Sequence, residues 1–587
     1  MGSSSSRPRH RAGPGAATAA PGREALRASR AGRRRIGALV ATGAALIAFT
    51  AGAVTGARHT DRRGEAVERF GQAWEAENYA EMHALLDPAA RARTPLDEFA
   101  ALHRQAGTTL TLATLQAGTP RTSGEDAMTL PVTLRTRVFG VLRRDLRVPV
   151  RERDGETLID WQPHMVFPGL RAGEALRRET TMPPRAAILA RDKTPLASGE
   201  PRITTLGASA AQAIGVLGPA PAEQARAAAA RGLPPAAPVG LSGLEEAFEG
   251  RLAGRPGGRL FTGTRVAASA KPRRGRDVRT TIDPRMQNAA VEALAGRFGG
   301  AIALDPASGE VLAFAGAAAG APQPPGSVFK IITLAAALEH GVTTPAERFP
   351  VATDTTLSGV RLQNANGESC GGSLRNSFAH SCNSVFAPLG VRVGPARLVE
   401  MAERFGFNRP PALPGEQPST IPAAGELGDD LGVGSTAIGQ GRLLATTVQM
   451  ASVAATIATG GTRHVPSLVL DERGARRRVL SPKIARSVAS GMVAVVAGGT
   501  GTAAAIPGVA VAGKTGTAEL RTSVPDPASP EAPGVDDPTD TDAWFAAFAP
   551  RRDPEVAVAV LLVSQGTGGA TAAPAARVLL QAGVRPG

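Results

Sequence analysis

The stretch Pro324–Lys330, with the sequence Pro-Pro-Gly-Ser-Val-Phe-Lys, places the strongest constraint on how this chain folds. Pro and Gly end the preceding segment, and the apolar run Ile331–Leu338 predicts a helix that begins at Ser327. Residues three apart share one face of a helix, so the side chains of Ser327 and Lys330 can touch. A hydroxyl beside an amine is a nucleophile beside its base. The alternative is a serine at a helix start with a solvated lysine one turn later.

Lysine is scarce in this chain, which makes each lysine informative. Of the 66 Lys and Arg residues only five are Lys, and two of these five, Lys330 and Lys514, lie in short motifs. Arginine keeps its proton in proteins, whereas a desolvated lysine can become a neutral base. Both lysines are therefore candidates for proton chemistry.

The net charge of +15 is unevenly distributed. Residues 1–35 carry nine Arg against the single acid Glu24, in a segment rich in Pro, Gly, Ser and Ala. We predict a disordered basic tail there. The rest of the chain shows no basic stripe interleaved with aromatic residues, so we expect no nucleic-acid partner. The eight His are scattered without an H-x-x-x-H pattern, so we expect no metal site and no cofactor.

Residues 36–57 form an uncharged apolar segment of about 22 residues, long enough to cross a bilayer. The cluster Arg33–Arg35 directly precedes it. Because basic flanks stay on the cytoplasmic side, we expect a single-pass protein of the cell membrane with its large C-terminal part outside the cytoplasm. The alternative is a cleaved signal peptide, because the segment ends in the small residues of Ala53–Ala57.

Three further regions follow the apolar segment. Residues 60–168 predict a small α+β domain, with a helical repeat over Val67–Leu86 and three alternating, strand-like segments: Thr108–Leu115, Ala127–Arg137 and Val138–Val150. Residues 169–279 predict a strand-rich connector with a helix over Ala220–Ala230. At Thr280 a compact domain, residues 280–587, begins with a helix over Met286–Leu294 and a hairpin that leads towards Ser327.

A second motif is Ser381-Cys382-Asn383. On a tight turn, the Ser381 hydroxyl could relay a proton and the Asn383 amide could hold the backbone of a peptide substrate. The pattern S-x-N is weak evidence by itself. Cys370 and Cys382 are the only cysteines, twelve residues apart in a chain expected to be exported, so a disulfide between them is one possibility and two unpaired thiols are the other.

A third motif is Lys514-Thr515-Gly516-Thr517, which follows an alternating, strand-like segment. Glycines on both sides of Lys514 and Thr515 leave the strand surface open, so a ligand could pair with its edge as an added strand. Lys514 and the hydroxyls of Thr515 and Thr517 would then meet a substrate carboxylate.

These three motifs in this order, S-x-x-K, S-x-N and K-T-G, resemble the penicillin-binding transpeptidase family, which shares its fold with serine β-lactamases. Five flanking stretches resemble the family as well: Thr280–Asp283, Leu304–Pro306, Gly309–Ala313, Ile438–Gly441 and Asp542–Phe545. In the connector, Arg185–Ala197 and Ser242–Glu245 resemble family signatures, and residues 62–168 look like the NTF2-like domain of a class B subgroup.

The resemblance implies a multidomain α+β protein. Its parts would be the cytoplasmic tail (1–35), a transmembrane helix (36–57), an NTF2-like domain (60–168), a dimerisation-type connector (169–279) and an α/β transpeptidase domain (280–587) with an antiparallel sheet flanked by helices. Two departures from the family pattern stand out. Ala186, Ala190 and Lys193 replace the usual Gly, Asp and Gly of the connector signature, and an acidic, Pro-rich insertion at Ser523–Asp542 predicts a mobile loop.

The resemblance also implies a mechanism. Lys330, desolvated and near the second cation Lys514, would take the proton of Ser327, which attacks the penultimate D-Ala of a peptidoglycan stem peptide ending in D-Ala-D-Ala. Backbone N–H groups of Ser327 and Thr517 would form the oxyanion hole. Ser381, with Lys514 behind it, would protonate the departing D-Ala. An amine of a neighbouring stem would then form the cross-link, and β-lactams would acylate Ser327.

Other functions remain open at this level. A D,D-carboxypeptidase or a β-lactamase would use the same residues with water as acceptor. A membrane β-lactam sensor calls for a larger cytoplasmic domain than the basic tail offers, and a non-catalytic scaffold conflicts with three intact motifs. We expect a glycosyltransferase of the wall-synthesis machinery as partner, because no second catalytic domain is evident.

Overall fold

The computed structural model describes residues 62–204, 214–519 and 541–585. The predicted basic tail and the predicted transmembrane segment lie outside these ranges. Within them, no helix combines the length and the apolar character that a membrane span requires. The chain divides into two compact units, of which the first takes most of residues 62–173 and the second takes Glu174 onwards together with residues 107–113 and 135–142.

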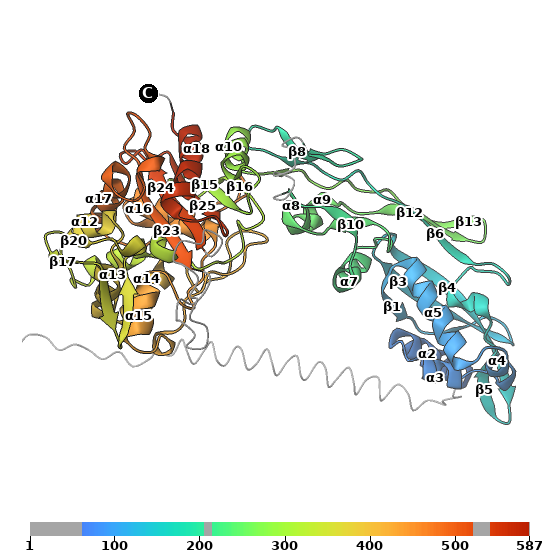
Figure 1. The fold of residues 1–587 in the computed structure, drawn as a ribbon. Coiled ribbons are helices and arrows are strands. Elements are labelled where there is room, and N and C mark those ends of the chain that lie inside the picture. The colour runs from blue at the N-terminus through green and yellow to red at the C-terminus, as the bar shows by residue number, and fades with distance from the viewer. Residues whose placement is uncertain (1–61, 205–213, 520–540, 586–587) are drawn as a thin grey trace, which may run out of the picture. The chain divides into compact units, whose positions relative to one another are not determined.

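The first region pairs helices with an antiparallel sheet (Figure 1). The helices are α2 (Arg62–Glu75), α3 (Tyr79–Ala84), α4 (Pro88–Arg93) and α5 (Leu96–Leu110). The sheet has the order β1-β3-β4-β5, with β2 paired to β3; its strands are β1 (Leu112–Ala117), β2 (Arg121–Thr122), β3 (Ala127–Thr136), β4 (Gly140–Arg153) and β5 (Glu156–Ile159).

Two element boundaries differ from the sequence prediction. The helix expected over Val67–Leu86 is broken into α2 and α3, because Glu77 takes a left-handed conformation (φ 52°) that ends the first helix. The strand expected from Thr108 begins only at Leu112, because α5 continues to Leu110, whose side chain is buried together with that of Ala106 one turn earlier.

Aromatic rings surround the buried His103 in this first unit. The ring centroid of His103 lies 4.6 Å from that of Phe99, 5.4 Å from that of Trp74 and 5.8 Å from that of Trp161. Among the described residues neither ring nitrogen has a hydrogen-bond partner. Burial lowers the pKa of His103 to about 3. The imidazole is therefore neutral and acts as part of the core.

The connector is strand-rich, as the sequence predicts (Figure 1). It contains a three-stranded sheet, a four-stranded sheet and a strand pair: β13-β12-β6 (Arg265–Ala270, Gly257–Thr262, Leu176–Thr181), β14-β7-β8-β9 (Val278–Arg279, Ile188–Leu189, Pro195–Ser198, Ile203–Thr204) and β10-β11 (Leu217–Pro219, Pro238–Gly240). Its helices are α7 (Ala222–Ala230), α8 (Gly243–Ala247) and α9 (Glu249–Leu252).

Buried ion pairs hold the connector together. The carboxylate of Glu245, 1% exposed at its side chain, contacts Arg185 at 2.7 Å and Arg202 at 2.6 Å. At the turn where Lys193 replaces a glycine of the family signature, the backbone is left-handed (φ 74°), and Ala190 N donates to the carbonyl of Thr194 at 2.8 Å. The turn thus forms with a lysine in the conformation that favours glycine.

The main sheet of residues 280–587 contains five antiparallel strands in the order β16-β15-β25-β24-β23. They are β15 (Gly299–Leu304), β16 (Val311–Ala315), β23 (Ala512–Glu519), β24 (Thr541–Ala549) and β25 (Val556–Leu562). The predicted hairpin is β15–β16, and the predicted helix is α10 (Pro284–Leu294), capped by the Asp283 carboxylate, which accepts from the backbone N–H groups of Arg285 and Met286. Strand β23 forms one edge of the sheet.

Helices cover both faces of this sheet (Figure 1). Along β25, Val558 and Val560 pack with α10 and α18 (Ala573–Gly583), while Ala559 and its alternate neighbours pack on the other face with α16 (Thr447–Ala458). This period-two alternation is why a continuous apolar strand can be buried on both sides.

The remaining elements come between β16 and β23 in the sequence. The helices are α11 (Lys330–Glu339), α12 (Leu374–Ala379), α13 (Asn383–Val393), α14 (Pro395–Phe405), α15 (Asp430–Ala437) and α17 (Pro482–Gly498). Three strand pairs accompany them: β17–β20 (Arg348–Ala352, Cys370–Ser373), β18–β19 (Asp354–Leu357, Val360–Gln363) and β21–β22 (Thr462–His464, Arg476–Arg478).

Asp542 corrects one detail of the sequence prediction. The sequence pattern predicts that it belongs to the acidic insertion, most of which lies outside the described residues. The structure instead places Asp542 in β24, fully buried, where its Oδ1 accepts from the backbone N–H of Ser564 at 3.0 Å. Burial raises the pKa of this carboxyl.

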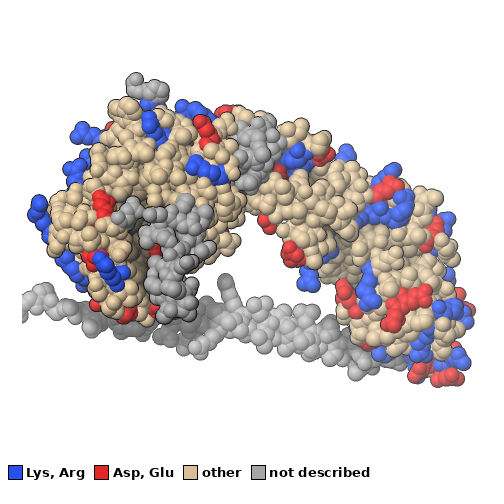
Figure 2. Space-filling view, viewed as in Figure 1, with Lys and Arg blue, Asp and Glu red and all other residues tan. Residues whose placement is uncertain are grey.

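Acidic and basic groups are interspersed over the visible surface (Figure 2). Many of them form exposed ion pairs, such as Arg147 with Asp126 at 3.2 Å and Arg151 with Asp160 at 2.8 Å. Exposed pairs of this kind each contribute little to stability.

Candidate active site

Ser327 and Lys330 are in contact, as the i,i+3 spacing predicts. The Nζ atom of Lys330 lies 2.9 Å from Oγ of Ser327. The local fold differs in one respect from the expected helix, because Gly326–Phe329 form a 3-10 turn and α11 begins only at Lys330. Gly326 has φ 52°, and a Cβ there would lie 2.5 Å from the carbonyl oxygen of Thr517. Glycine therefore lets the turn that carries Ser327, Gly326–Phe329 (the nucleophile turn), approach β23 closely.

Lys330 is fully buried and touches the second motif. Its Nζ atom lies 2.7 Å from the carbonyl oxygen of Ser381, 3.2 Å from Oγ of Ser381 and 2.6 Å from Oδ1 of Asn383. Burial, and then the charge of Lys514, lowers the pKa of Lys330 well below its usual value. No described carboxylate lies within ion-pair distance of Nζ of Lys330, so no salt bridge raises this pKa.

Lys514 projects from β23 towards the same turn. Its Nζ atom donates to Oγ of Ser381 at 2.8 Å and to the carbonyl of Thr515 at 2.9 Å. It is also fully buried, and desolvation lowers its pKa to about 7. The Ser381 hydroxyl thus lies between the two lysines of the site.

Two phenylalanines flank the Ser381 turn and lie beneath the lysines. Nζ of Lys330 is 5.9 Å from the ring centre of Phe386, and Nζ of Lys514 is 5.7 Å from that of Phe378. The two rings pack edge to face with centroids 5.6 Å apart. Aromatic faces attract cations, so this pair offsets part of the cost of burying the lysines while excluding water.

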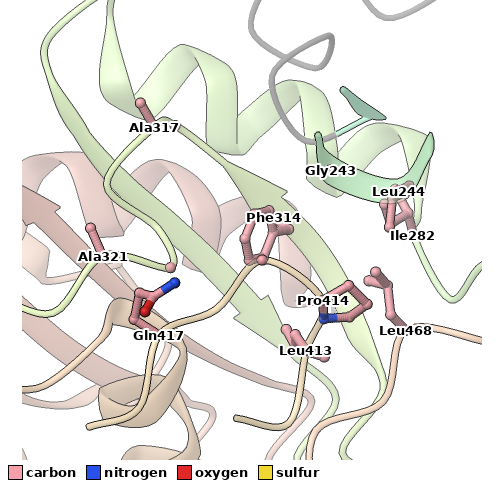
Figure 3. A pocket seen from close by; sticks show the side chains of 13 residues that line it. Gly243, Leu244, Ile282, Phe314, Ala317, Ala321, Leu413, Pro414, Gln417 and Leu468 are labelled. Atoms are coloured by element: carbon pink, nitrogen blue, oxygen red, sulfur yellow. The ribbon is translucent and has the colours of Figure 1, made fainter. Parts of the chain in front are cut away.

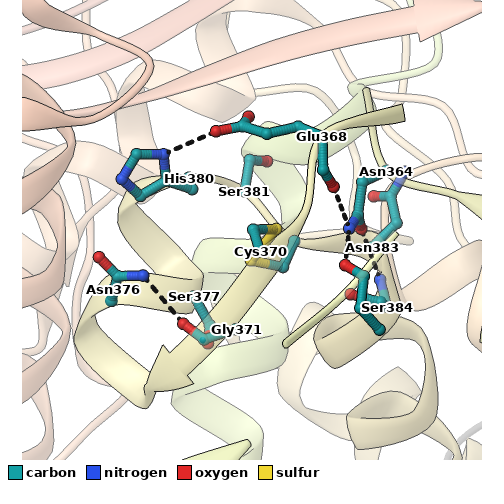
Figure 4. The surroundings of a disulfide bond; sticks show 12 residues. Asn364, Glu368, Cys370, Gly371, Asn376, Ser377, His380, Ser381, Asn383 and Ser384 are labelled. Carbon is teal, nitrogen blue, oxygen red and sulfur yellow. Dashed lines mark hydrogen bonds and ion pairs between the residues drawn. A yellow bond between two sulfur atoms is a disulfide. The ribbon is translucent and has the colours of Figure 1, made fainter. Parts of the chain in front are cut away.

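The Ser381 turn is held from several sides (Figure 4). Ser381 itself is left-handed (φ 58°), a strained conformation for serine. Cys382 forms a disulfide with Cys370 of β20. Nδ2 of Asn383 donates to the carbonyl of Gln363 at 2.8 Å, and Oδ1 of the buried Asn364 accepts from the backbone N–H of Ser384 at 2.9 Å. The disulfide and the two amides anchor the turn to β19 and β20.

The third motif lies on the edge strand, next to the nucleophile turn. A Cβ on Gly516 would lie 2.7 Å from the carbonyl oxygen of Pro325, so this glycine allows β23 and the turn to pack together. The hydroxyl of Thr517 accepts from the backbone N–H of Gly568 at 3.3 Å. The hydroxyl of Thr515 lies 2.5 Å from that of Thr500.

All five residues predicted as catalytic, Ser327, Lys330, Ser381, Asn383 and Lys514, are thus joined in one hydrogen-bonded cluster. Sequence reasoning missed Phe378, Phe386, Gln363, Asn364 and Thr500. The phenylalanines lie three residues from Ser381 and Asn383, a spacing that could have drawn attention to them. The other three carry no motif, since they reach the site only through tertiary packing.

A separate cavity of about 210 Å³ lies where the connector meets the five-stranded sheet region (Figure 3). Leu244, Ile282, Phe314, Leu413 and Leu468 contribute its apolar lining, and none of the predicted site residues borders it. Within the described ranges, no group of three or more His, Cys, Asp or Glu side chains is arranged to hold a metal ion.

Three family models match the chain. The penicillin-binding protein transpeptidase domain matches residues 299–581, the penicillin-binding protein dimerisation domain matches residues 200–280, and the NTF2-like N-terminal transpeptidase domain matches residues 63–174.

Curated relatives and solved structures agree with these matches. Peptidoglycan D,D-transpeptidase PbpA of Mycolicibacterium smegmatis is 35% identical over 414 residues, which cover 59% of this chain and 80% of the relative. PbpA of Mycobacterium tuberculosis is 34% identical over 403 residues, 57% of this chain and 76% of the relative. A ceftriaxone acyl-enzyme structure of M. tuberculosis penicillin-binding protein A aligns with TM-score 0.55 and 29% identity over 68% of this chain and 98% of that one.

Proposed function

Because the chain belongs to the penicillin-binding protein transpeptidase family, we propose that it is a class B peptidoglycan D,D-transpeptidase with Ser327 as nucleophile. The observation that carries this proposal is the set of atoms around Nζ of Lys330. Burial lowers the pKa of Lys330 and so favours the neutral amine, which has two hydrogens and one lone pair.

Each of the two hydrogens on Nζ of Lys330 has a hydrogen-bond acceptor. The carbonyl oxygen of Ser381 and Oδ1 of Asn383 can only accept, and they lie at 2.7 Å and 2.6 Å. The lone pair is then left for a hydroxyl, and that of Ser327, at 2.9 Å, is nearer than that of Ser381, at 3.2 Å. Lys330 is therefore arranged to accept the proton of Ser327.

The first half-reaction follows from this arrangement. Oγ of Ser327 bonds to the carbonyl carbon of the penultimate D-Ala while its proton moves to Nζ of Lys330. Backbone N–H groups of Ser327 and Thr517 stabilise the oxyanion, a role that the close approach of Gly326 to the Thr517 carbonyl supports. The C–N bond then breaks, and Ser381, backed by Lys514 at 2.8 Å, passes its proton to the nitrogen of the departing D-Ala. Ser381 takes up in exchange the proton held by Nζ of Lys330, 3.2 Å away, so Lys330 is neutral again.

The second half-reaction returns the serine. An amine of a neighbouring stem peptide attacks the ester, the new amide is the cross-link, and Ser327 regains its proton.

The donor strand pairs with the free edge of β23, where the hydroxyls of Thr515 and Thr517 bind its terminal carboxylate. β-Lactams acylate Ser327 in the same way, but no acceptor reacts quickly with the resulting ester, so the adduct persists.

We further propose that residues 36–57 anchor the enzyme in the cell membrane as a single span, with the catalytic domain outside the cytoplasm. The uncharged segment and the preceding arginines support this topology. A glycosyltransferase of the wall-synthesis machinery would supply the glycan strands, since the matched domains include no glycosyltransferase.

Labelling with a fluorescent penicillin tests the proposed nucleophile. Ser327→Ala is expected to abolish labelling, while Ser487→Ala, on α17, should label like the wild type; undiminished labelling of Ser327→Ala would refute the assignment. The lifetime of the penicilloyl adduct separates the reaction classes. An adduct stable for hours is expected of a transpeptidase, whereas turnover in seconds would identify a β-lactamase.

A further inference from the structure

Thr500 lies between two of the catalytic motifs, although it belongs to neither. It follows α17, and its backbone N–H donates to the carbonyl of Ala379, at the end of the helix that leads into Ser381, at 3.1 Å. A Cβ on Gly569 would lie 2.5 Å from the carbonyl oxygen of Thr500. The backbone around Thr500 is therefore fixed, and its side chain points at β23, where its Oγ1 lies 2.5 Å from Oγ1 of Thr515.

The hydroxyl hydrogens of this pair can be assigned. Thr500 has one hydrogen and two acceptors in reach, Oγ1 of Thr515 at 2.5 Å and the carbonyl of Ala379 at 3.4 Å. The longer contact is at the limit for an O–H donor, and that carbonyl already accepts the backbone N–H of Thr500. We therefore assign the hydrogen of Thr500 to Oγ1 of Thr515. With that assignment, the hydrogen of Thr515 has no other acceptor among the described side chains.

We propose that Thr500 is a positioning residue that turns the Thr515 hydroxyl outward as a donor for the C-terminal carboxylate of the acyl donor. The inference rests on the proposed transpeptidase function. A carboxylate accepts hydrogen bonds and donates none, so Thr515 recognises it only when its hydrogen is free. In the opposite arrangement Thr515 would donate to Thr500 and would present lone pairs to a negative group. Thr500 thus selects the chemical form of the substrate end without touching it.

The test compares two thioester acyl donors, one ending in a carboxylate and one in the matching carboxamide. With the carboxylate donor, Thr500→Val is expected to raise KM about tenfold, the equivalent of one hydrogen bond, with kcat close to that of the wild type. Thr500→Ser, which keeps the hydroxyl, should stay within about twofold of the wild type. With the carboxamide donor, Thr500→Val and the wild type should react alike.

A double-mutant cycle and a melting curve complete the design. In the Thr515→Val background, Thr500→Val is expected to cause no further rise in KM for the carboxylate donor, because the two hydroxyls act as one unit. Thr500→Ala replaces Thr500→Val if the latter does not fold. The positioning role is overturned if Thr500→Val has the wild-type KM for the carboxylate donor. It is also overturned if Thr500→Val lowers the Tm and weakens the reaction with both donors equally. A wild-type chain that reacts with neither donor overturns the proposed function itself, and this inference with it.

Discussion

Asn383 holds Lys330 through a 2.6 Å hydrogen bond from Nζ to Oδ1, while Nδ2 of the same amide donates to the carbonyl of Gln363. The second bond fixes which end of the amide faces the lysine. A neutral acceptor satisfies one hydrogen of Lys330 without adding negative charge. An amide at this position therefore leaves the lowered pKa of Lys330 unopposed by a negative charge.

Asn383→Asp is therefore expected to shift the pH dependence of acylation. A carboxylate at this distance favours the charged lysine, so it raises the pKa of Lys330. The rise of the acylation rate with pH, which reports the loss of that proton, should move to higher pH, with the rate near neutrality strongly reduced. Stopped-flow penicillin acylation measures the profile. Asn376→Asp, at an exposed position on α12, is the control, and an unshifted Asn383→Asp profile contradicts the base assignment.

Lys330→Arg is expected to lose nearly all acylation. Arginine stays protonated, so it cannot accept the proton of Ser327, and general-base catalysis is typically worth about a hundredfold to ten-thousandfold in rate. Lys483→Arg, on the exposed side of α17, should acylate like the wild type. Labelling time courses at saturating penicillin give the rates. Acylation by Lys330→Arg at the wild-type rate would remove Lys330 from the mechanism.

Replacing Cys370 and Cys382 together by serine is expected to destabilise the enzyme. In the chain-entropy model, closing a loop of this length is worth roughly 3 kcal/mol. Acylation should slow as well, because Cys382 lies between Ser381 and Asn383. Urea unfolding and penicillin labelling, each with and without reductant, check both effects. Reductant should alter the wild type and leave the variant unchanged; an unaffected wild type would show that the turn needs no covalent support.

His103 should make the first unit sensitive to acid. Its folded-state pKa of about 3 lies below the unfolded value of 6.5, so the unfolded chain binds the extra proton between these values. Stability is then lost as pH falls from about 6.5 towards 3, by up to about 1.4 kcal/mol per pH unit. His103→Leu should flatten this dependence. Hydrogen exchange of residues 62–106 against pH measures the difference; equal slopes in wild type and His103→Leu would be the contrary result.

The sequence was most informative where function depends on short-range spacing. The i,i+3 relation of Ser327 to Lys330, the hairpin before them and α10 with its Asp283 cap are local patterns, and the structure contains all three. Boundaries that depend on tertiary packing were misjudged. The left-handed Glu77 splits a helix with continuous apolar periodicity, and Asp542 is buried although its sequence neighbourhood is acidic.

The candidate site shows the same division. Motif residues could be named in advance because their chemistry is distinctive, above all Lys330 and Lys514, two of only five lysines in an arginine-rich chain. The supporting residues are ordinary in type and distant in sequence. Thr500, after α17, meets Thr515 on β23, and Gln363, at the end of β19, meets Asn383 at the start of α13, so neither contact follows from a sequence period.

The strand order of the catalytic sheet has a consequence for biosynthesis. β25 is the last strand of the domain in sequence, yet it lies between β15 and β24 at the centre of the sheet. Until the ribosome has translated Leu562, the β15–β16 hairpin has no neighbour, and β23 and β24 cannot dock beside it. The Ser327–Lys330 pair therefore cannot meet Lys514 in a finished site on any shorter nascent chain. Penicillin binding would thus mark only molecules that have been translated through β25.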